Sequence, residues 1–369
     1  MRWVIGVIGA TLLGAVLRDA FETIILPRRV SRRFRITRLF YRATWLPWRA
    51  TARLLPAKRR EAVLSVFGPL SLLALLSLWA VGIVFAFGLL QWAAGSALIL
   101  AGGVPGFAAD LYLSGTTFFT LGLGDVVPRT ALAKALTVIE AGMGFAFLAI
   151  VIGYLPVIYQ AFSRREGAIA LLDARAGSPP TAGELLWRHR GEEQRDALRQ
   201  LLQEWEHWAA DVLESHLSYP VLAYFRSQHN NQSWLAALTT ILDASALVMV
   251  GLEGWCMHQA ELTFAMARHA AVDLAQVFST PPTAPAAERL PEQELARLRA
   301  RLAQGGLELR DRELGERLAE LRRMYEPYVA ALAAYLAVPL PPWLRTVDRP
   351  DNWQTSAWDR TPRPPREHF

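Results

Sequence analysis

Residues 114–128 read Ser-Gly-Thr-Thr-Phe-Phe-Thr-Leu-Gly-Leu-Gly-Asp-Val-Val-Pro, and the fold follows from what surrounds this stretch. Its centre, from Thr120 to Asp125, carries two glycines separated by one leucine. Glycine adopts positive φ values without steric cost, so Gly122 and Gly124 permit a backbone of unusual dihedral angles. Taken alone, the same residues suit an ordinary turn between two helices. The flanking segments must therefore decide between the two interpretations.

A long apolar segment precedes this stretch. The chain of 369 residues is 53% hydrophobic, and the excess is concentrated: no Asp, Glu, Lys or Arg occurs between Ala62 and Ala109. A membrane helix needs about 20 apolar residues, so residues 62–91 predict one complete span. The glycines and the proline of residues 92–107 predict a loop outside the membrane.

A short helix and a second span complete the pattern. Residues 110–119 predict a helix too short to cross a bilayer. Residues 130–162 are apolar apart from Lys134 and Glu140, and they predict a second span that ends before Arg164-Arg165. Basic residues thus flank the same side of both spans, and the positive-inside rule places that side in the cytoplasm.

In this order, the two spans, the short helix and the glycine stretch resemble the potassium-channel pore-domain family, a bacterial type of two-transmembrane, pore-loop ion channel. The filter of that family follows T-x-G-[Y/F/L]-G-D, which Thr120, Gly122, Gly124 and Asp125 match. The resemblance covers about residues 62–163. It implies that the ion-conducting filter is Thr120, Leu121, Gly122, Leu123 and Gly124, with Asp125 at the outer mouth.

The physics of ion conduction explains these residue types. A potassium ion must shed its water, and backbone carbonyl oxygens replace the hydration shell. Irregular backbone at membrane depth is tolerated only where protein encloses it around a watery path. One loop cannot enclose a pore, so the resemblance implies a homotetramer.

Two departures from the family pattern concern the filter's support. Leu123 replaces the common tyrosine, and Thr116 stands where some relatives carry a glutamate that supports the aspartate. We expect a less rigid filter, with reduced K⁺/Na⁺ discrimination or faster inactivation. Glu140 is a charged residue inside an apolar span, which makes it a functional candidate. It either supports the filter or contacts the ion directly. The residues assigned to filter support are Thr116, Thr117, Phe118, Phe119 and Glu140.

The second span also carries candidate gating residues. A gap-free match places the family's hinge glycine at Gly144, where glycine offers a bending point. The alternative is that a small residue only lets helices approach closely. In the same register an apolar inner gate, which closes by dewetting, consists of Phe145, Leu148, Ile152 and Pro156.

The N-terminal region adds membrane-associated elements. Residues 1–27 predict a retained membrane helix, with Asp19 and Glu22 near its cytoplasmic end within reach of the arginines that follow. Residues 28–61 contain twelve Lys and Arg before the first acid. Interleaved aromatic residues favour an interfacial helix over nucleic-acid binding. The candidates for binding anionic lipid headgroups are Arg28, Arg29, Arg32, Arg33, Arg35 and Arg38.

The rest of the chain predicts a helical cytoplasmic domain over residues 164–338. Residues 235–252 are apolar enough for a further span, but Asp243 at their middle favours a buried helix of a bundle. Residues 339–369 predict a proline-rich tail that is extended or disordered. The predicted helices run from Thr181 to His216, from the Asn230–Ser233 cluster to Phe278, and from Glu292 to Tyr335.

The sequence therefore predicts an all-α membrane protein: a two-helix plus pore-loop channel domain, an extra N-terminal membrane helix and a helical cytoplasmic domain. We expect passive K⁺ conduction in a multi-pass protein of the cell membrane, of bacterial inner-membrane type. We expect no catalytic residues, no enzyme activity, no cofactor or metal beyond permeant K⁺, and no nucleic-acid partner. The alternatives are a non-selective cation channel and a membrane-anchored ligand-binding or signalling module.

Overall fold

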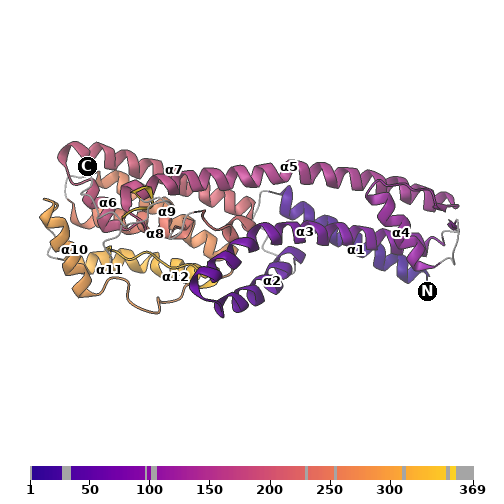
Figure 1. The fold of residues 1–369 in the computed structure, drawn as a ribbon, viewed down its shortest axis with the longest axis horizontal. Helices are drawn as coiled ribbons and strands as arrows, with labels where there is room; N and C mark the ends of the chain where they lie inside the picture. The colour runs from indigo at the N-terminus through magenta and orange to yellow at the C-terminus, as the bar shows by residue number, and fades with distance from the viewer. Residues whose placement is uncertain are drawn as a thin grey trace. The chain divides into compact units, whose positions relative to one another are not determined.

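The computed structural model describes residues 2–26, 35–95, 98–100, 106–228, 232–252, 256–309, 313–345 and 350–354. The chain divides into two compact units, Met1–Gln160 and Ala161–Phe369. Both are built of helices (Figure 1), and the protein is an all-α membrane protein. The boundary lies three residues before the end of the predicted channel domain at residue 163.

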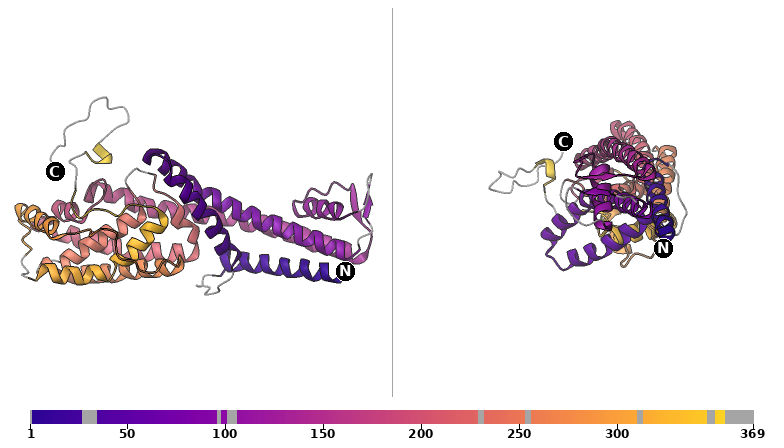
Figure 2. Two further views of the ribbon diagram at one scale, coloured as in Figure 1. Left: turned by 90° about the horizontal axis from the view of Figure 1, so that it is seen from below. Right: turned by 90° about the vertical axis from the view of Figure 1, so that its right-hand side faces the viewer.

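The first unit contains the apolar helices. Three helices in it are long and apolar enough to cross a membrane: α1, α3 and the first part of α5. Figure 2 shows α1 alongside α3, and the two helices are in contact. The short helix α4 also packs on α3. The helices are α1 (Arg2–Ile24), α2 (Ile36–Arg53), α3 (Ala57–Ala93), α4 (Phe107–Phe118) and α5 (Ala131–Ala176).

The helix that contains the second span is longer than expected. α5 continues past residue 162 and ends at Ala176. The prediction stopped at the basic pair Arg164-Arg165, but charged residues mark the end of an apolar segment without ending a helix. The helix passes through Gly167 and ends where Gly177, which has positive φ, is followed by Pro179 and Pro180.

A buried carboxylate joins α1, α2 and α3. Asp19 on α1 is 4% exposed. It accepts hydrogen bonds from the Thr37 hydroxyl (2.6 Å), the Thr37 backbone N–H (3.1 Å) and the Trp79 indole N–H (3.0 Å). The N-cap residue of α2, Arg35, makes no side-chain cap hydrogen bond. Asp19 therefore caps α2 from another helix, and its negative charge suits the positive end of the helix dipole.

Asp19 and Glu22 were both expected within reach of the arginines that follow. Glu22 pairs with Arg18 at 3.0 Å and lies 3.9 Å from Arg35. Among the described residues, Asp19 accepts instead from Thr37 and Trp79. Trp79 lies 60 residues further along the chain, so no local pattern could indicate this contact.

Two short strands replace part of the predicted outer loop. β1 (Leu98–Leu100) pairs antiparallel with β2 (Val126–Pro128), and Ile99 lies opposite Val127. Residues 96–97 and 101–105 of the predicted loop lie outside the described residues, and the three apolar residues between them form a ladder. The strand pair ties the segment after Asp125 to the chain that precedes α4.

The second unit is a helical bundle centred on α8. α8 contacts α6, α9, α11 and α12, and 94% of its apolar window is buried within the protein. Residues 235–252 therefore lie in a buried helix of the bundle, as expected. The helices of this unit are α6 (Ala182–Arg188), α7 (Arg195–Ser218), α8 (Trp234–Gly251), α9 (Met257–Val277), α10 (Glu292–Gln304), α11 (Leu314–Arg323) and α12 (Glu326–Leu336), with 3₁₀ turns η1 (Glu192–Gln194), η2 (Pro220–Tyr224) and η3 (Asn352–Gln354).

The predicted helices of this unit are each divided. The predicted helix over 292–335 is α10, α11 and α12, interrupted after Gly305-Gly306 and before Pro327. The segment from Thr181 to His216 is α6 and α7, separated around Gly191, and the one ending at Phe278 is α8 and α9. The apolar periodicity of the sequence continues across these breaks, so periodicity alone did not reveal where each helix ends.

The predicted tail is partly folded. Trp343 and Asp351 are both fully buried. The proline content of this region was interpreted as extended or disordered chain, but an extended segment can pack on a bundle. The described residues 339–345 and 350–354 therefore include buried anchors of the second unit.

Candidate functional site

The backbone from Thr120 to Gly124 has an alternating conformation. φ is +58° at Thr120, +56° at Gly122 and +79° at Gly124, whereas Leu121 and Leu123 are not among the positive-φ residues. Such alternation turns successive carbonyl groups toward one side, as carbonyl coordination of an ion requires. The glycines were expected to adopt these angles. Thr120 was not, and positive φ at a β-branched residue is a strained conformation of the kind found at functional sites.

The short helix α4 holds the start of this segment. The Thr116 carbonyl accepts from the backbone N–H of Leu121 at 2.8 Å and of Gly122 at 3.4 Å, and the Thr117 carbonyl accepts from Thr120. The Thr116 hydroxyl donates back within α4, toward the Tyr112 and Leu113 carbonyls. Leu121 and Leu123 are more than 60% exposed in the single chain. The strained segment is therefore anchored at its helix end and open along its length.

Asp125 at the predicted outer mouth has a partner that the sequence analysis missed. The Tyr112 hydroxyl donates to Asp125 Oδ2 at 2.9 Å. For the aspartate itself, the sequence pointed only to Thr116, where some relatives carry a supporting glutamate. Tyr112 lies one helical turn earlier on α4, so it faces the same side as Thr116. That spacing was a signal in the sequence.

Replacing Tyr112 by phenylalanine should weaken the hold on Asp125. Since Tyr112 is 42% exposed, water competes for this hydrogen bond, and we expect a shift of only a few-fold toward non-conducting filter conformations. Single-channel recording of open-time decay would measure it, with Tyr328→Phe in the second unit as the control. Inactivation equal to wild type would remove Tyr112 from the filter's support.

The two phenylalanines before the filter behave differently. Phe118 is 3% exposed and packs on Phe147 of α5, with ring centroids 5.6 Å apart. Phe119 is largely exposed and meets Phe118 edge-on at 5.2 Å. Phe118 thus joins the end of α4 to α5, two residues before Thr120.

Gly144 lies at the closest approach of α5 to α4. A Cβ on this residue would stand 2.0 Å from the Phe118 carbonyl oxygen, far inside contact distance. α5 is helical through Gly144 and Pro156. The geometry gives Gly144 a packing role, and the hinge remains a prediction.

The residues predicted for the inner gate share one face of α5. Phe145 and Ile152 are 70% and 64% exposed in the single chain, and Leu148 and Pro156 are exposed as well. Their spacing of three, four and four residues keeps them in one line along the helix. This apolar line is available to other copies of α5 or to lipid.

Glu140 and Ser114 connect α5 with α4. Both side chains are fully buried, and the Ser114 hydroxyl hydrogen-bonds Glu140 Oε1. Ser114 Oγ also lies 2.7 Å from the Val84 carbonyl oxygen on α3. The role of Glu140 in supporting the filter stays a prediction, and its hydrogen bond with Ser114 was not anticipated.

The lipid-binding candidates are described only in part. Arg28, Arg29, Arg32 and Arg33 lie outside the described residues. The Arg35 guanidinium donates to the Thr23 hydroxyl at 3.0 Å and lies near Glu22, so it is engaged with α1. Arg38 on α2 is exposed.

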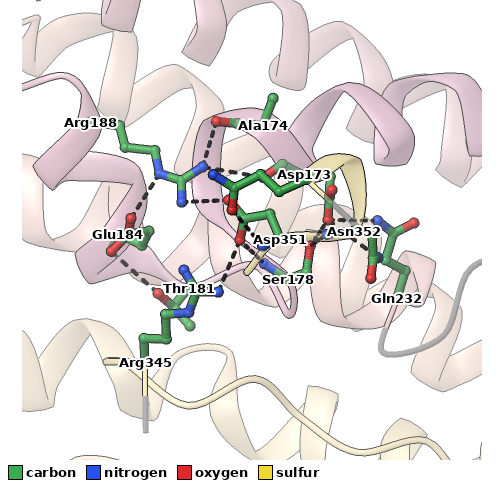
Figure 3. Close-up of polar contacts among 11 residues, drawn as sticks. Asp173, Ala174, Ser178, Thr181, Glu184, Arg188, Gln232, Arg345, Asp351 and Asn352 are labelled. Atoms are coloured by element: carbon green, nitrogen blue, oxygen red, sulfur yellow. Dashed lines mark hydrogen bonds and ion pairs between the residues drawn. The ribbon is translucent and has the colours of Figure 1, made fainter. Parts of the chain in front are cut away.

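The second unit contains a buried polar cluster where α5 ends (Figure 3). Arg188 donates to Glu184 and Asp351, both at 2.8 Å, and to the Ala174 carbonyl at 2.6 Å. Ser178 and Gln232 hydrogen-bond Asp173. The cluster joins the end of α5, the start of α8 and the C-terminal segment through groups that satisfy one another. Among the described residues no group of His, Cys, Asp and Glu is arranged to hold a metal ion.

A buried arginine fixes the same helix nearer its entry into the second unit. Arg165 donates to the Leu222 and Phe225 carbonyls at 2.8 Å, and its Nη1 lies 3.2 Å from His216 Nε2. Burial, and then the charge of Arg165, lower the pKa of His216 to about 3. His216 is therefore neutral and accepts from Arg165, while its Nδ1 donates to the Val212 carbonyl at 2.7 Å. His216 thus lies in the core of the second unit.

Comparison with known families identifies the first unit. The family model described as Ion channel matches residues 74–160. These residues form an ion-channel domain. The matched segment contains α4, the filter segment and the apolar line of α5, and its last residue is the last residue of the first unit. Neither the comparison with curated proteins nor that with solved structures found a match.

Proposed function

We propose that this protein is one subunit of a homotetrameric, potassium-selective channel that conducts K⁺ passively through Thr120–Gly124. The alternation of φ along the filter segment carries the proposal. A turn needs one or two residues with positive φ, whereas three at alternate positions suit a row of carbonyl ligands. Asp125, exposed at the end of the row, would concentrate cations at the outer mouth.

The exposure of α5 supports assembly into a tetramer. Only 11% of its apolar window is buried in one chain, against 56% for α3. Part of this surface suits lipid. The exposed filter backbone does not, because unsatisfied peptide groups are costly in hydrocarbon. Copies of the chain around one axis would enclose the filter and bring the apolar line from Phe145 to Pro156 together as a gate.

The remaining assignments follow from charge. Arginines precede α3, and Arg164-Arg165 follow the apolar part of α5, so the second unit would lie in the cytoplasm of a bacterial cell and could regulate the gate. Arg38 and the preceding arginines would meet anionic lipid headgroups. In this proposal the protein is a transport protein without catalytic residues, and K⁺ is the ion carried rather than a cofactor.

A non-selective cation channel is the second candidate. Leu123 lacks the phenol of the common tyrosine, and Thr116 bonds within α4 rather than to Asp125. A filter held by fewer contacts would discriminate less. Reversal potentials in mixed K⁺ and Na⁺ separate the two candidates: a near-zero shift on exchanging the ions favours the non-selective channel.

The full-length protein in liposomes should show K⁺ flux that Ba²⁺ blocks, and Gly122→Ala should abolish it. Alanine at φ +56° is strained by about 1–2 kcal/mol, and in a fourfold assembly that strain would act four times. Gly106→Ala is the matched control, because Gly106 has extended φ and no described atom lies within 4 Å of its added Cβ. Flux retained in Gly122→Ala, or a monomeric protein in detergent, would refute the proposal.

A further inference from the structure

The junction of Ser114 and Glu140 brings three helices to one hydroxyl group. Ser114 is on α4, Glu140 on α5, and the Val84 carbonyl on α3. Ser114 Oγ is within hydrogen-bond distance of both Val84 O and Glu140 Oε1. Both side chains are fully buried in the single chain, and assembly can only add to that burial.

The protons at this junction can be counted. A serine hydroxyl donates one hydrogen bond, and a backbone carbonyl only accepts. An ionised carboxylate also only accepts, so with Glu140 ionised one of the two contacts would place oxygen against oxygen without a proton. A carboxylic acid has a proton to donate. Glu140 can then donate to Ser114, which in turn donates to Val84.

The second oxygen of Glu140 points to the same state. Oε2 is buried and has no hydrogen-bond partner among the described residues. An ionised carboxylate in such a place would hold a charge with one oxygen unsatisfied, which is far more costly than an unsatisfied carbonyl of a neutral acid.

The described charged groups on α3, α4 and α5 include no cation that is shown to pair with Glu140. α3 carries no Asp, Glu, Lys, Arg or His from Ala62 to its end at Ala93. α4 carries Asp110, 4% exposed and one turn before Ser114, and Tyr112, which faces Asp125. On α5 the nearest cation along the chain is Lys134, which is exposed. A buried carboxyl group without a cation beside it would gain nothing by ionising.

We propose that Glu140 is in its acid form and that its proton clasps the inner helix α5 to the pore helix α4. The proposal rests on the channel function above and assigns Glu140 and Ser114 as positioning residues of the filter. When the proton leaves for bulk water, the carboxylate of Glu140 is left buried. The Ser114 hydroxyl is then the one donor at this junction for two acceptors, Glu140 Oε1 and the Val84 carbonyl oxygen. The clasp then opens, α4 loses its tie to α5, and the filter loses support at alkaline pH.

The test compares pH profiles of K⁺ flux for the full-length protein in liposomes. Wild type should lose flux above an alkaline midpoint, by about tenfold per pH unit. Glu140→Gln should conduct with a flat profile, because its amide donates to Ser114 as the acid does and does not ionise. It retains every other titrating group, so the difference from wild type isolates Glu140. Glu140→Ala should be impaired at every pH.

Infrared spectroscopy adds a readout that does not need flux. Wild type should show the carbonyl band of a buried protonated carboxyl group, and Glu140→Gln should lack it. The same pH profile in wild type and Glu140→Gln, or an infrared band that survives the substitution, would overturn the proposal. If wild type carried no K⁺, the channel function would fail, and the band would still decide the protonation of Glu140.

Discussion

Gly144→Ala should abolish K⁺ flux and lower the thermal stability of the protein. The added Cβ would meet the Phe118 carbonyl oxygen at 2.0 Å and its carbonyl carbon at 2.8 Å. Both atoms belong to the backbone, so no side-chain rotation relieves the clash. α5 must move away from the end of α4, two residues before Thr120, and a cost of about 3 kcal/mol is expected, at the upper end for overpacking.

Gly142→Ala is the matched control, because no described atom lies within 4 Å of its added Cβ. The pair also separates the two roles considered for Gly144. A hinge alone would leave Gly144→Ala at least as stable as wild type, since alanine favours helix by about 1 kcal/mol over glycine. Differential scanning calorimetry of the purified full-length protein, beside flux, would measure both. Equal stability of the two variants would exclude the packing role.

Asp243→Ala should strongly destabilise the second unit. Asp243 is fully buried on α8, where both of its oxygens accept from Arg289 and the Tyr325 hydroxyl donates to Oδ1. Burial and the adjacent Asp243 raise the pKa of Tyr325. Without the carboxylate, Glu326 at 3.1 Å is the one acid partner that the described residues leave to the buried guanidinium of Arg289. Removing one partner of a buried ion pair costs about 3–5 kcal/mol. Because Glu326 still partners Arg289, we expect a loss of about 3 kcal/mol in the free energy of unfolding.

Asp196→Ala is the control for this prediction. Its pair with Arg199 has an N–O distance of 3.6 Å, and both side chains are well exposed, so no measurable change is expected. Urea unfolding followed by tryptophan fluorescence would report the difference, since Arg289 lies 5.7 Å from the ring of Trp343. A midpoint for Asp243→Ala equal to that of Asp196→Ala would show that Arg289 finds compensation elsewhere.

The elements that the sequence predicted depend on short stretches of chain. Apolar runs marked the helices α1, α3 and α5, and the order of the motif residues marked the filter. Contacts between residues distant in sequence were missed, among them Asp19 with Trp79 and Asp243 with Arg289. These pairs determine which helices meet, and neither composition nor periodicity contains them. The helix breaks were different, because Gly305-Gly306 and Pro327 were visible in the sequence.

Within the site, prediction was good where glycine supplies the conformation and weak where tertiary contacts do. Gly122 and Gly124 have the positive φ expected of them. Thr120 also has positive φ, and its backbone N–H is held by the Thr117 carbonyl at the end of α4. A threonine in the sequence gives no local signal for that angle. Tyr112 was discernible by its spacing from Thr116, whereas the meeting of Ser114 with Glu140 required three helices to be in place.

The cap that Asp19 provides for α2 has a consequence for any attempt to isolate the conducting part. A shortened chain that retains all of residues 74–160 would keep Trp79 and discard the only oxygen seen to receive its indole proton within the described residues. The residues that match the family are therefore fewer than the residues that the folded domain needs. Expression of such a fragment should fail unless the first helix is supplied, even as a separate peptide.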